Sequence, residues 1–588
     1  MPQGNPKDDP KDDPRHAGGL SRRAVSRVRD GWKAGITRRM TARGRVPDSF
    51  SFKPESLILG SPEAAAALLR GQFALAGTSA RVERGDPWRA DAPSAAWEEA
   101  AHGFGWLEHF RAADGETARQ AARKMTDGWL HRHGRAGGLP WRPPVVGDRI
   151  VAWCMSANLL TENAEMVYRT DLFRSLAAQG RYLRRTAVSE AIPRDRLRAA
   201  LGVAYVGLCV EGEGGLLKPG MDGVLAAARA CLAGDGGPHS RNPSDLLDIL
   251  RMLVQVREDL KAAGEGAMAG ALAPLIERAA PMLRMLRLGG GSLAMFHGGR
   301  EEAAALVDLI LVESGDTRPA PESAPDTGYL RLSAGGIAAV LDAGSPAEGT
   351  YARSSHAAPL ALSFASGAQR IIVNCGSGVH LGADWEGPCR ASAAHSTLTV
   401  AERSPCEFQD RVNTRFRRLG RVARIVDSQS QRDESGIWTL AAHDGYAARH
   451  GLIHYRRLFL DADGGDLRGE DTLTLAKGGA RVLERSRAKR KSPDGPHFAI
   501  RFHLHPDVAV SVEEGKAIIT LADGETWQMM QSGGKLAIED SVYIPGPVAP
   551  LPTKQIVIES ALRDTEGQVR WALKKLNGRR AIAPAEEE

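Results

Sequence analysis

The chain has 588 residues, of which 43% are hydrophobic, and a formal net charge of +6. This length is too great for one ordinary domain, and the apolar content is ample for more than one core. No apolar run approaches the roughly 18 residues of a membrane-spanning helix. The six cysteines form no CxxC pair, which argues against a zinc ribbon or a disulfide framework and favours reduced thiols in an intracellular protein.

Residues 1–50 are predicted to lie outside the packed domains. They contain the polar repeat PKDDPKDDP, which cannot bury enough surface to order itself. Residues 21–43 then place apolar residues at helical spacing among arginines. Such a basic amphipathic helix either lies on an anionic membrane surface or docks on the protein as a terminal helix. It lacks the continuous apolar region of a secretory signal, so the sequence by itself predicts a cytoplasmic location.

Residues 51–315 carry apolar side chains at three- and four-residue steps, which is typical of amphipathic helices. The clearest helix begins in SRNPSDLL, where Pro243 suits the first turn and Asn242 or Ser244 suits the N-cap. Gly264 lies where the helix is expected to stop. Many such helices joined by short loops predict helix pairs packed in layers, as in bundles and toroids.

Residues 316–328 are rich in Pro, Ser and Asp and are predicted to be a linker. Over residues 329–575 the apolar period changes to two, in short runs bounded by Gly, Asp or Pro. That pattern predicts an antiparallel β-sandwich or a superhelical pair of sheets. Residues 576–588 are assigned to a tail. The chain is therefore expected to be a helical domain followed by a β domain.

One stretch of the β domain gathers residues that bind metals or move protons. Two strand-like runs flank a turn at Gly367, which predicts a hairpin. His356 precedes this hairpin, Asn374 ends its second strand, and His395 begins the next predicted strand. We therefore expect these three side chains to meet at the ends of neighbouring strands.

Helices followed by a β-sandwich, with this hairpin opening the β half, resemble the heparinase II/III-like polysaccharide lyases. The resemblance rests on SHAAPLALSFASGAQRIIVNCG, RASAAHSTLTV, AAHDGYAARHGLIHYRRLFL and IRFHLHP, and on HGFGWL, DGGPHSRNP and MLRLGGGSLAMFHGG in the helical half. It implies an incomplete (α/α) toroid followed by an antiparallel β-sandwich, with a substrate cleft between them. It also implies cleavage of a uronate-containing acidic polysaccharide by β-elimination, and a location in the cell envelope or periplasm.

The implied reaction removes the weakly acidic C5 proton of a uronate and expels the glycosidic oxygen. The site must neutralise the carboxylate, supply a base for the proton and supply an acid for the leaving oxygen. The resemblance makes His395 and His356 the candidate catalytic histidines, and Tyr446 is a candidate for the acid. It requires no cofactor but allows a structural zinc at His356, Asn374 and His395. Asn374 stands where the zinc-binding members have Asp, and Asn is a poorer zinc ligand.

Five further residues are candidates for binding the polysaccharide. His239, Arg241 and Asn242 cluster at a helix N-terminus, where backbone N–H groups favour an anion and an arginine can fork onto a carboxylate. An ordinary capping loop is the alternative. Trp385 and Arg390 precede the last of the three predicted strands, where they either line a sugar site or anchor a packed loop.

Three other patterns have weaker functional interpretations. Tyr446 belongs to HDGY, which otherwise reads as a turn of the sandwich. His503 and His505 alternate to one face of a strand, and a half-buried structural pair is favoured over a metal chelate. Gly289–Gly291 lacks the strand and helix context of a phosphate loop, so no nucleotide site is predicted. No nucleic-acid partner is expected either.

The family pattern is also incomplete in this chain. Where the zinc-binding lyases carry a further His, this chain has Arg353, Ser354 and Ser355, and no Tyr follows Asn242 at the family's catalytic position. A second hypothesis therefore stays open. The chain is either a lyase whose partner is an acidic polysaccharide or oligosaccharide, or a catalytically degenerate glycan-binding or envelope-associated protein on the same scaffold.

Overall fold

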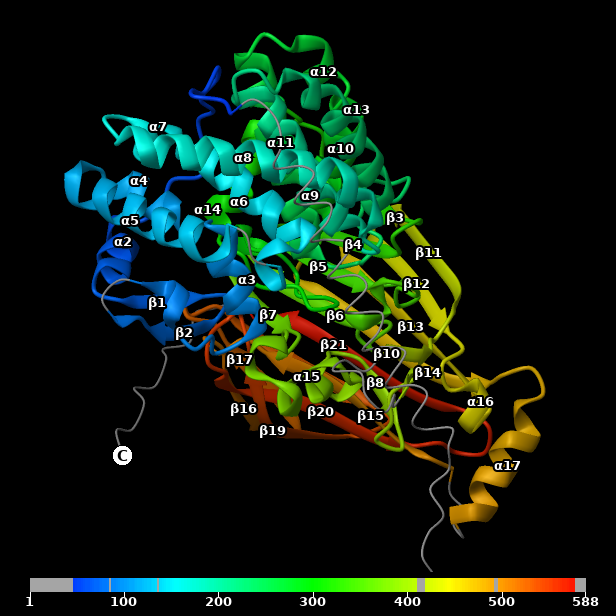
Figure 1. The fold of residues 1–588 in the computed structure, drawn as a ribbon. Helices are drawn as coiled ribbons and strands as arrows, with labels where there is room; N and C mark the ends of the chain where they lie inside the picture. The colour runs from blue at the N-terminus through cyan, green and yellow to red at the C-terminus, as the bar shows by residue number, and fades with distance from the viewer. Residues whose placement is uncertain (1–45, 84–85, 135–136, 410–417, 491–494, 577–588) are drawn as a thin grey trace, which may run out of the picture.

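The computed structural model describes residues 46–83, 86–134, 137–409, 418–490 and 495–576. The amphipathic segment predicted at 21–43 and nearly all of the predicted tail lie outside these ranges. The described chain forms a helical half followed by a sheet half, and Figure 1 shows the helices gathered over one side of the sheets. Within these ranges, no helix combines the length and apolar content that a membrane crossing needs.

The N-terminal half is built from helices around a shared apolar core, with a small two-stranded sheet beside the first of them, β1 (Gln72–Leu75) and β2 (Thr78–Arg81). Its helices are α2 (Pro62–Leu69), α3 (Ala95–Gly103), α4 (Leu107–Ala113), α5 (Gly115–His133), α6 (Pro143–Met155), α7 (Ala157–Thr161), α8 (Met166–Thr186), α9 (Pro193–Cys209), α10 (Leu217–Cys231), α11 (Pro243–Ala262), α12 (Gly266–Gly270), α13 (Ala273–Met285) and α14 (Ala304–Ser314). Helix α9 packs against α6, α8 and α10, which places it in the interior of this half.

Helix α11 begins where its sequence predicts. Asn242 is the N-cap, and its Oδ1 accepts hydrogen bonds from the backbone N–H of Ser244 at 2.9 Å and of Asp245 at 3.4 Å. Pro243 occupies the first turn, where no N–H is needed. The apolar stripe of this helix is buried along its whole length. It consists of Leu246, Leu247, Leu250, Leu253, Val254 and Leu260.

Two antiparallel sheets form the C-terminal half. The eight-stranded sheet runs β11 (Ile425–Asp433), β12 (Gly436–His443), β13 (Leu452–Asp461), β14 (Asp466–Leu475), β21 (Gly567–Lys575), β18 (Thr526–Ser532), β17 (Lys516–Thr520) and β16 (Ala509–Glu513). The nine-stranded sheet runs β19 (Lys535–Tyr543), β20 (Leu551–Ala561), β15 (His497–Leu504), β7 (Gln369–Val373), β6 (Leu362–Ser366), β5 (Ile337–Asp342), β4 (Tyr329–Ala334) and β3 (Ser323–Ala324), with β8 (Leu398–Val400) paired to β15. Outside them lie β9 (Glu407–Gln409), β10 (Arg418–Arg421), α15 (Ala383–Arg390), α16 (Ala447–His450) and α17 (Gly479–Arg490).

The nine-stranded sheet is the middle layer of the molecule. In β5, Ala338 and Val340 belong to the core shared with the helices, whereas Ile337, Ala339 and Leu341 belong to the core between the two sheets. Alternate side chains of a strand point to opposite faces, so one face of β5 packs against the helices and the other against the second sheet. Every residue of β5 is therefore buried.

The predicted hairpin is present as β6 and β7, and Gly367 at its turn has a φ of +52°. Gly289 packs against this turn so closely that a Cβ on it would lie 1.7 Å from the Gly367 carbonyl oxygen. Close packing therefore accounts for a glycine at position 289. The third predicted strand, β8, pairs with β15 and not with the hairpin, because β15 occupies the place beside β7.

Candidate active site

The structure brings His356, Asn374 and His395 together beside the hairpin. His356 Nδ1 lies 3.0 Å from His395 Nε2, and His395 Nδ1 lies 3.2 Å from Asn374 Oδ1. The three residues are between 0% and 2% exposed. They form a buried chain of hydrogen bonds along the edge where the sheet meets the helical half.

The Asn374 amide is oriented by its own hydrogen bonds. Its Oδ1 accepts the backbone N–H of Ser396 at 3.0 Å, and its Nδ2 donates to Ser363 Oγ at 3.3 Å. His395 therefore faces an acceptor on each side, Asn374 Oδ1 at Nδ1 and the Cys389 carbonyl, 3.2 Å away, at Nε2. A neutral imidazole ring can donate to only one of these two acceptors.

Burial keeps both imidazole rings neutral. Loss of hydration lowers the pKa of His395 to about 3. The same cause, with the neighbouring His395 ring, holds the pKa of His356 well below its ordinary value. A general base is most effective when its pKa lies near the working pH. His356 is therefore a weak base where it stands.

The Nε2 atom of His356 faces a notch at Gly298. A Cβ on Gly298, whose φ is +84°, would lie 3.6 Å from His356 Nε2 and 3.7 Å from Asn242 Nδ2. Because Asn242 Oδ1 caps helix α11, its Nδ2 is the group turned to the notch. An imidazole nitrogen from the sheet half and an amide donor from the helical half therefore share one small space.

Arg241, predicted to bind a substrate carboxylate, instead binds a carboxylate of the protein. Its Nη2 forms an ion pair with Asp342 at the end of β5, and its other nitrogens donate to the carbonyls of Thr327 at 2.7 Å and Gly344 at 2.9 Å. Burial would raise the pKa of Asp342, but Arg241 and His297 together hold it below its usual value. The guanidinium therefore uses its hydrogen bonds on internal groups, and these bonds join the helical half to the middle sheet.

His297 and Asp342 complete this cluster, although the sequence patterns do not single them out. His297 Nδ1 accepts the backbone N–H of His356 at 3.2 Å, and its Nε2 lies 2.9 Å from Asp342 Oδ2. The proton of this ring therefore lies on Nε2 and faces the carboxylate. The available signal was a polar residue at the end of each of two apolar runs, SLAMFHGG and IAAVLDAG.

Tyr446 and Arg390 are both buried and bonded to the backbone. Tyr446 is 1% exposed, and its hydroxyl donates to the Leu398 carbonyl at 2.8 Å. Arg390 is 2% exposed and donates from Nε to the Ser355 carbonyl at 3.0 Å, which fixes the loop that carries His356. The contacts of Arg390 agree with a packed loop anchor.

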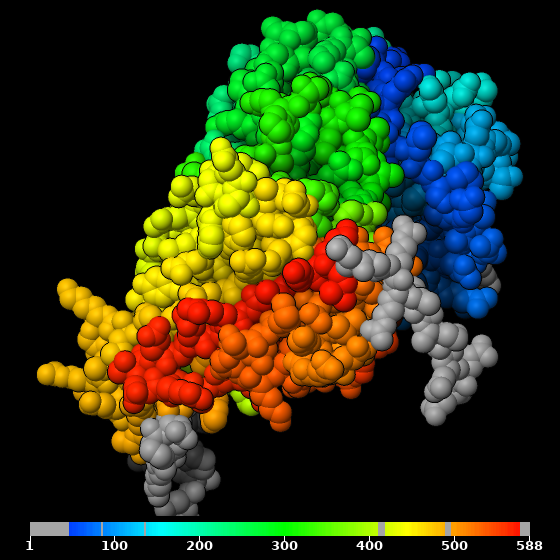
Figure 2. All heavy atoms as spheres, turned by 180° about the vertical axis from the view of Figure 1, so that it is seen from behind, coloured from blue at the N-terminus to red at the C-terminus, as the bar shows by residue number. Residues whose placement is uncertain are grey.

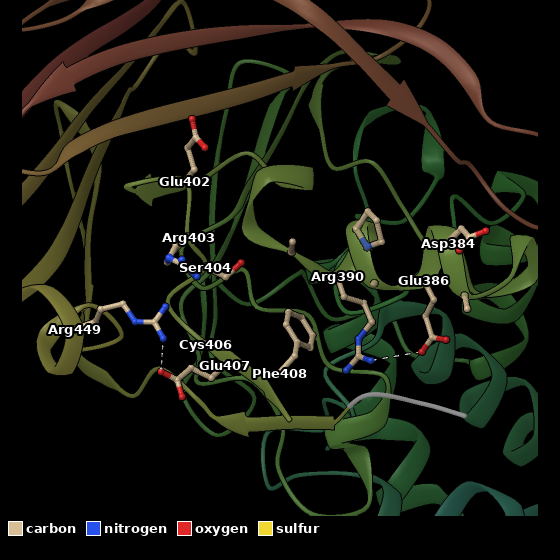
Figure 3. Close-up of a pocket in the computed structure, with 14 residues that line it drawn as sticks. Asp384, Glu386, Arg390, Glu402, Arg403, Ser404, Cys406, Glu407, Phe408 and Arg449 are labelled. Carbon is tan, nitrogen blue, oxygen red and sulfur yellow. Dashed lines mark hydrogen bonds and ion pairs between the residues drawn. The ribbon is translucent and has the colours of Figure 1, made fainter. Parts of the chain in front are cut away.

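A hollow of 890 Å³ lies beside this loop, between α15 and residues 402–408. Figure 3 shows Arg390 reaching to Glu386 at one end and Arg449 paired with Glu407 at the other. Its described charged lining is Asp384, Glu386, Glu402 and Glu407 with Arg390, Arg403 and Arg449. Carboxylates thus outnumber guanidiniums there, which does not suit a polyanion. Trp385 lies half-buried on α15.

His239 lies apart from the buried histidines. It is exposed in the loop before α11, where its backbone N–H donates to the Cys231 carbonyl at 2.9 Å.

The residues at the predicted zinc position supply few donors. His356 and His395 turn one nitrogen each toward the other, but Asn374 faces the opposite nitrogen of His395. A structural zinc takes about four ligands, so these residues do not fit a closed zinc site. Over the described ranges, no group of three or more His, Cys, Asp or Glu side chains could hold a metal ion.

His503 and His505 have separate partners. His503 Nδ1 lies 2.7 Å from Ser541 Oγ, and its Nε2 lies 3.0 Å from the Ala393 carbonyl. The His505 ring packs on Tyr543, with the ring centres 4.9 Å apart. These contacts favour two structural histidines over a metal chelate.

Purified protein is expected to contain far less than one zinc ion per chain, because the donors at His356 and His395 are too few. Plasma mass spectrometry after dialysis measures this directly. A full equivalent of zinc that is lost in His395→Ala and kept in the control His239→Ala would contradict the expectation.

Comparison with known proteins agrees with this architecture. Residues 316–572 match the family model described as Heparinase II/III-like, C-terminal. The FtsZ-localized protein C of Caulobacter vibrioides (strain NA1000 / CB15N) is 29% identical over 552 residues, which cover 90% of this chain and 91% of the relative.

Two solved structures share the fold at low identity. Heparinase III has a TM-score of 0.67 and 11% identity, with 95% of this chain and 91% of that chain covered. Heparan sulfate lyase HepC from Pedobacter heparinus has a TM-score of 0.57 and 12% identity, with 93% and 88% covered. The likeness confirms the predicted order of a helical toroid and a β-sandwich. Residues 316–572 are therefore similar to the C-terminal domain of the heparinase II/III-like proteins.

Proposed function

We propose that this chain is a heparinase-like protein without lyase activity that works with FtsZ at the site of bacterial cell division. The burial of His356 and His395 carries the first part of the proposal, since the rings are 2% and 1% exposed. The second part is supported by the relative named FtsZ-localized protein C, which matches 90% of this chain.

Each role in β-elimination lacks an available group. The base must touch the C5 proton, but His356 is buried and its pKa is low. Tyr446, the candidate acid, is buried with its hydroxyl bonded to the Leu398 carbonyl, and Arg241, the candidate partner of the carboxylate, is paired with Asp342. A polysaccharide would have to break these internal contacts before any chemistry began.

A lyase is the second candidate function, and one observation favours it. The Nε2 atom of His356 and the Asn242 amide face the same notch at Gly298. A proton acceptor beside an amide donor is the minimum that abstraction of a C5 proton from a uronate requires. This candidate needs the helical half and the sheet half to separate enough to admit a sugar.

Incubation with heparan sulfate, alginate or hyaluronan is expected to produce no unsaturated uronate, because His356 cannot reach the C5 proton. The ultraviolet absorbance of the unsaturated product is the readout. A rise in absorbance that His356→Ala abolishes and His239→Ala preserves would establish the lyase and refute the first part of the proposal.

The association with FtsZ is tested separately by sedimentation. FtsZ encoded by the same genome, assembled with GTP, should carry the protein into the pellet in a saturable way. FtsZ without nucleotide is the control and should leave the protein in the supernatant. If the protein stays in the supernatant with assembled FtsZ, the second part of the proposal is wrong whatever the lyase assay shows.

A further inference from the structure

We infer that the outer face of the eight-stranded sheet is a docking surface for an acidic peptide segment of a partner protein. The surface is a hollow of 540 Å³ lined by strands β12, β13, β14, β21 and β18. Figure 2 shows these strands, in yellow, red and orange, side by side on one face of the molecule. The inference goes beyond the proposed function and does not depend on it. We call the surface the Trp438 trough.

Strand register builds the trough from two rows of side chains. Side chains two residues apart on a strand share a face, so the two rows lie side by side. The first row joins directly opposed residues on successive strands, namely Trp438, Phe459, Arg468, Ala572 and Met530. The second row, formed in the same way, is Arg457, Glu470, Arg570 and Ser532.

The first row offers an apolar anchor site. Trp438 is 42% exposed, although its ring centre lies only 4.3 Å from that of Phe459. Ala572 carries a single methyl group between the longer Arg468 and Met530, so it has the smallest side chain of the row. An aliphatic or aromatic side chain placed over Ala572 would contact its two neighbours in the row, Met530 and the aliphatic part of Arg468. Trp and Arg are also the residues that most often dominate binding energy in protein interfaces.

The charges of the trough select an acidic occupant. The side chains of Arg457, Arg468 and Arg570 are 53%, 63% and 67% exposed, whereas those of their partners Glu470 and Asp466 are only 21% and 17% exposed. One carboxylate, that of Glu470, also serves two arginines. The charge that a partner meets is therefore positive.

These ion pairs do not prevent binding. Solvent-exposed ion pairs contribute little to stability, so an incoming carboxylate can exchange for one of them. An acidic segment with one apolar side chain satisfies the trough in both respects, since its carboxylates meet the arginines while its apolar group covers Ala572.

Selection of random peptides displayed on phage, with the full chain as bait, tests the inference. The enriched peptides are expected to be acidic and to carry a Trp, Phe, Leu or Ile anchor. A synthetic copy should bind Arg570→Glu and Ala572→Trp at least about tenfold more weakly than the wild type. Val512→Ala is the matched control, because Val512 is 47% exposed on β16 of the same sheet and lies outside the trough.

Arg570→Glu changes an exposed side chain and keeps the test valid if Ala572→Trp does not fold. Enrichment of peptides without acidic residues, or binding that Arg570→Glu leaves unchanged, would overturn the inference. Binding that appears only in a chain ending at Leu576 would show that the chain's own acidic residues 586–588 occupy the trough, which would also overturn it.

Discussion

Replacement of Arg241 by Ala is expected to lower the free energy of unfolding by about 3–5 kcal/mol. The substitution leaves the Asp342 carboxylate, which is 1% exposed, without its guanidinium partner. It also removes the donors to the carbonyls of Thr327 and Gly344, which lie between the helical half and the middle sheet. Denaturant unfolding followed by circular dichroism measures the loss.

A matched control lies nearby in Arg300→Ala. Arg300 pairs with Glu302, but its side chain is 43% exposed, so the expected loss is below about 1 kcal/mol. The double replacement Arg241→Met with Asp342→Leu should recover much of the stability, because it leaves no unpaired buried charge. A loss for Arg241→Ala as small as that of the control would mean that the ion pair is not desolvated in solution.

Acidification to about pH 5 is expected to destabilise the protein, and two of its buried histidines, His102 and His503, together contribute about 4 kcal/mol of that loss. Burial lowers the pKa of His102 to about 3 and that of His503 to about 4. In the unfolded chain both rings take up a proton below about pH 6.5, while the folded rings stay neutral. The unfolded state therefore binds more protons in this window, and stability falls as the pH falls from about 6.5 toward 4.

The contribution of His102 can be isolated by replacing it. His102 Nδ1 accepts the indole N–H of Trp129 at 3.0 Å, and the Asn oxygen in His102→Asn can accept the same bond without titrating. In the same pH window, the slope of unfolding free energy against pH should be smaller in this variant than in the wild type by about 1.4 kcal/mol per pH unit. His239→Asn is the exposed control and should keep the full pH dependence. If stability depends on pH equally in the wild type and in both variants, His102 is not a source of the acid sensitivity.

Hydrophobic periodicity predicted the elements because it records which side of each segment meets a core. Helix α11 and the β6–β7 hairpin follow their predicted patterns for this reason. The pairing of β8 with β15 was not predictable in the same way. It joins Leu398 to Ile500, far apart in sequence, and no pattern in either segment indicates which strand it pairs with.

The candidate site was predicted in part. Residue type and strand position identified His356, Asn374 and His395, and the structure brings them together. Their burial was not predictable, because it depends on how the helical half covers the end of the sheet. The assignment of Arg241 to a substrate was open for the same reason, since its partner Asp342 lies in the other half of the chain.

The middle sheet also has a consequence for how the chain is made. The helical core includes Tyr329, Ala338, Val340 and Ala365, all of which are synthesised after α14, the last helix of the helical half. A nascent chain that has only reached residue 315 therefore carries an apolar helical surface with nothing to cover it. Native burial of that surface must wait for the strands, so the helical half depends on the remainder of translation to complete its own core.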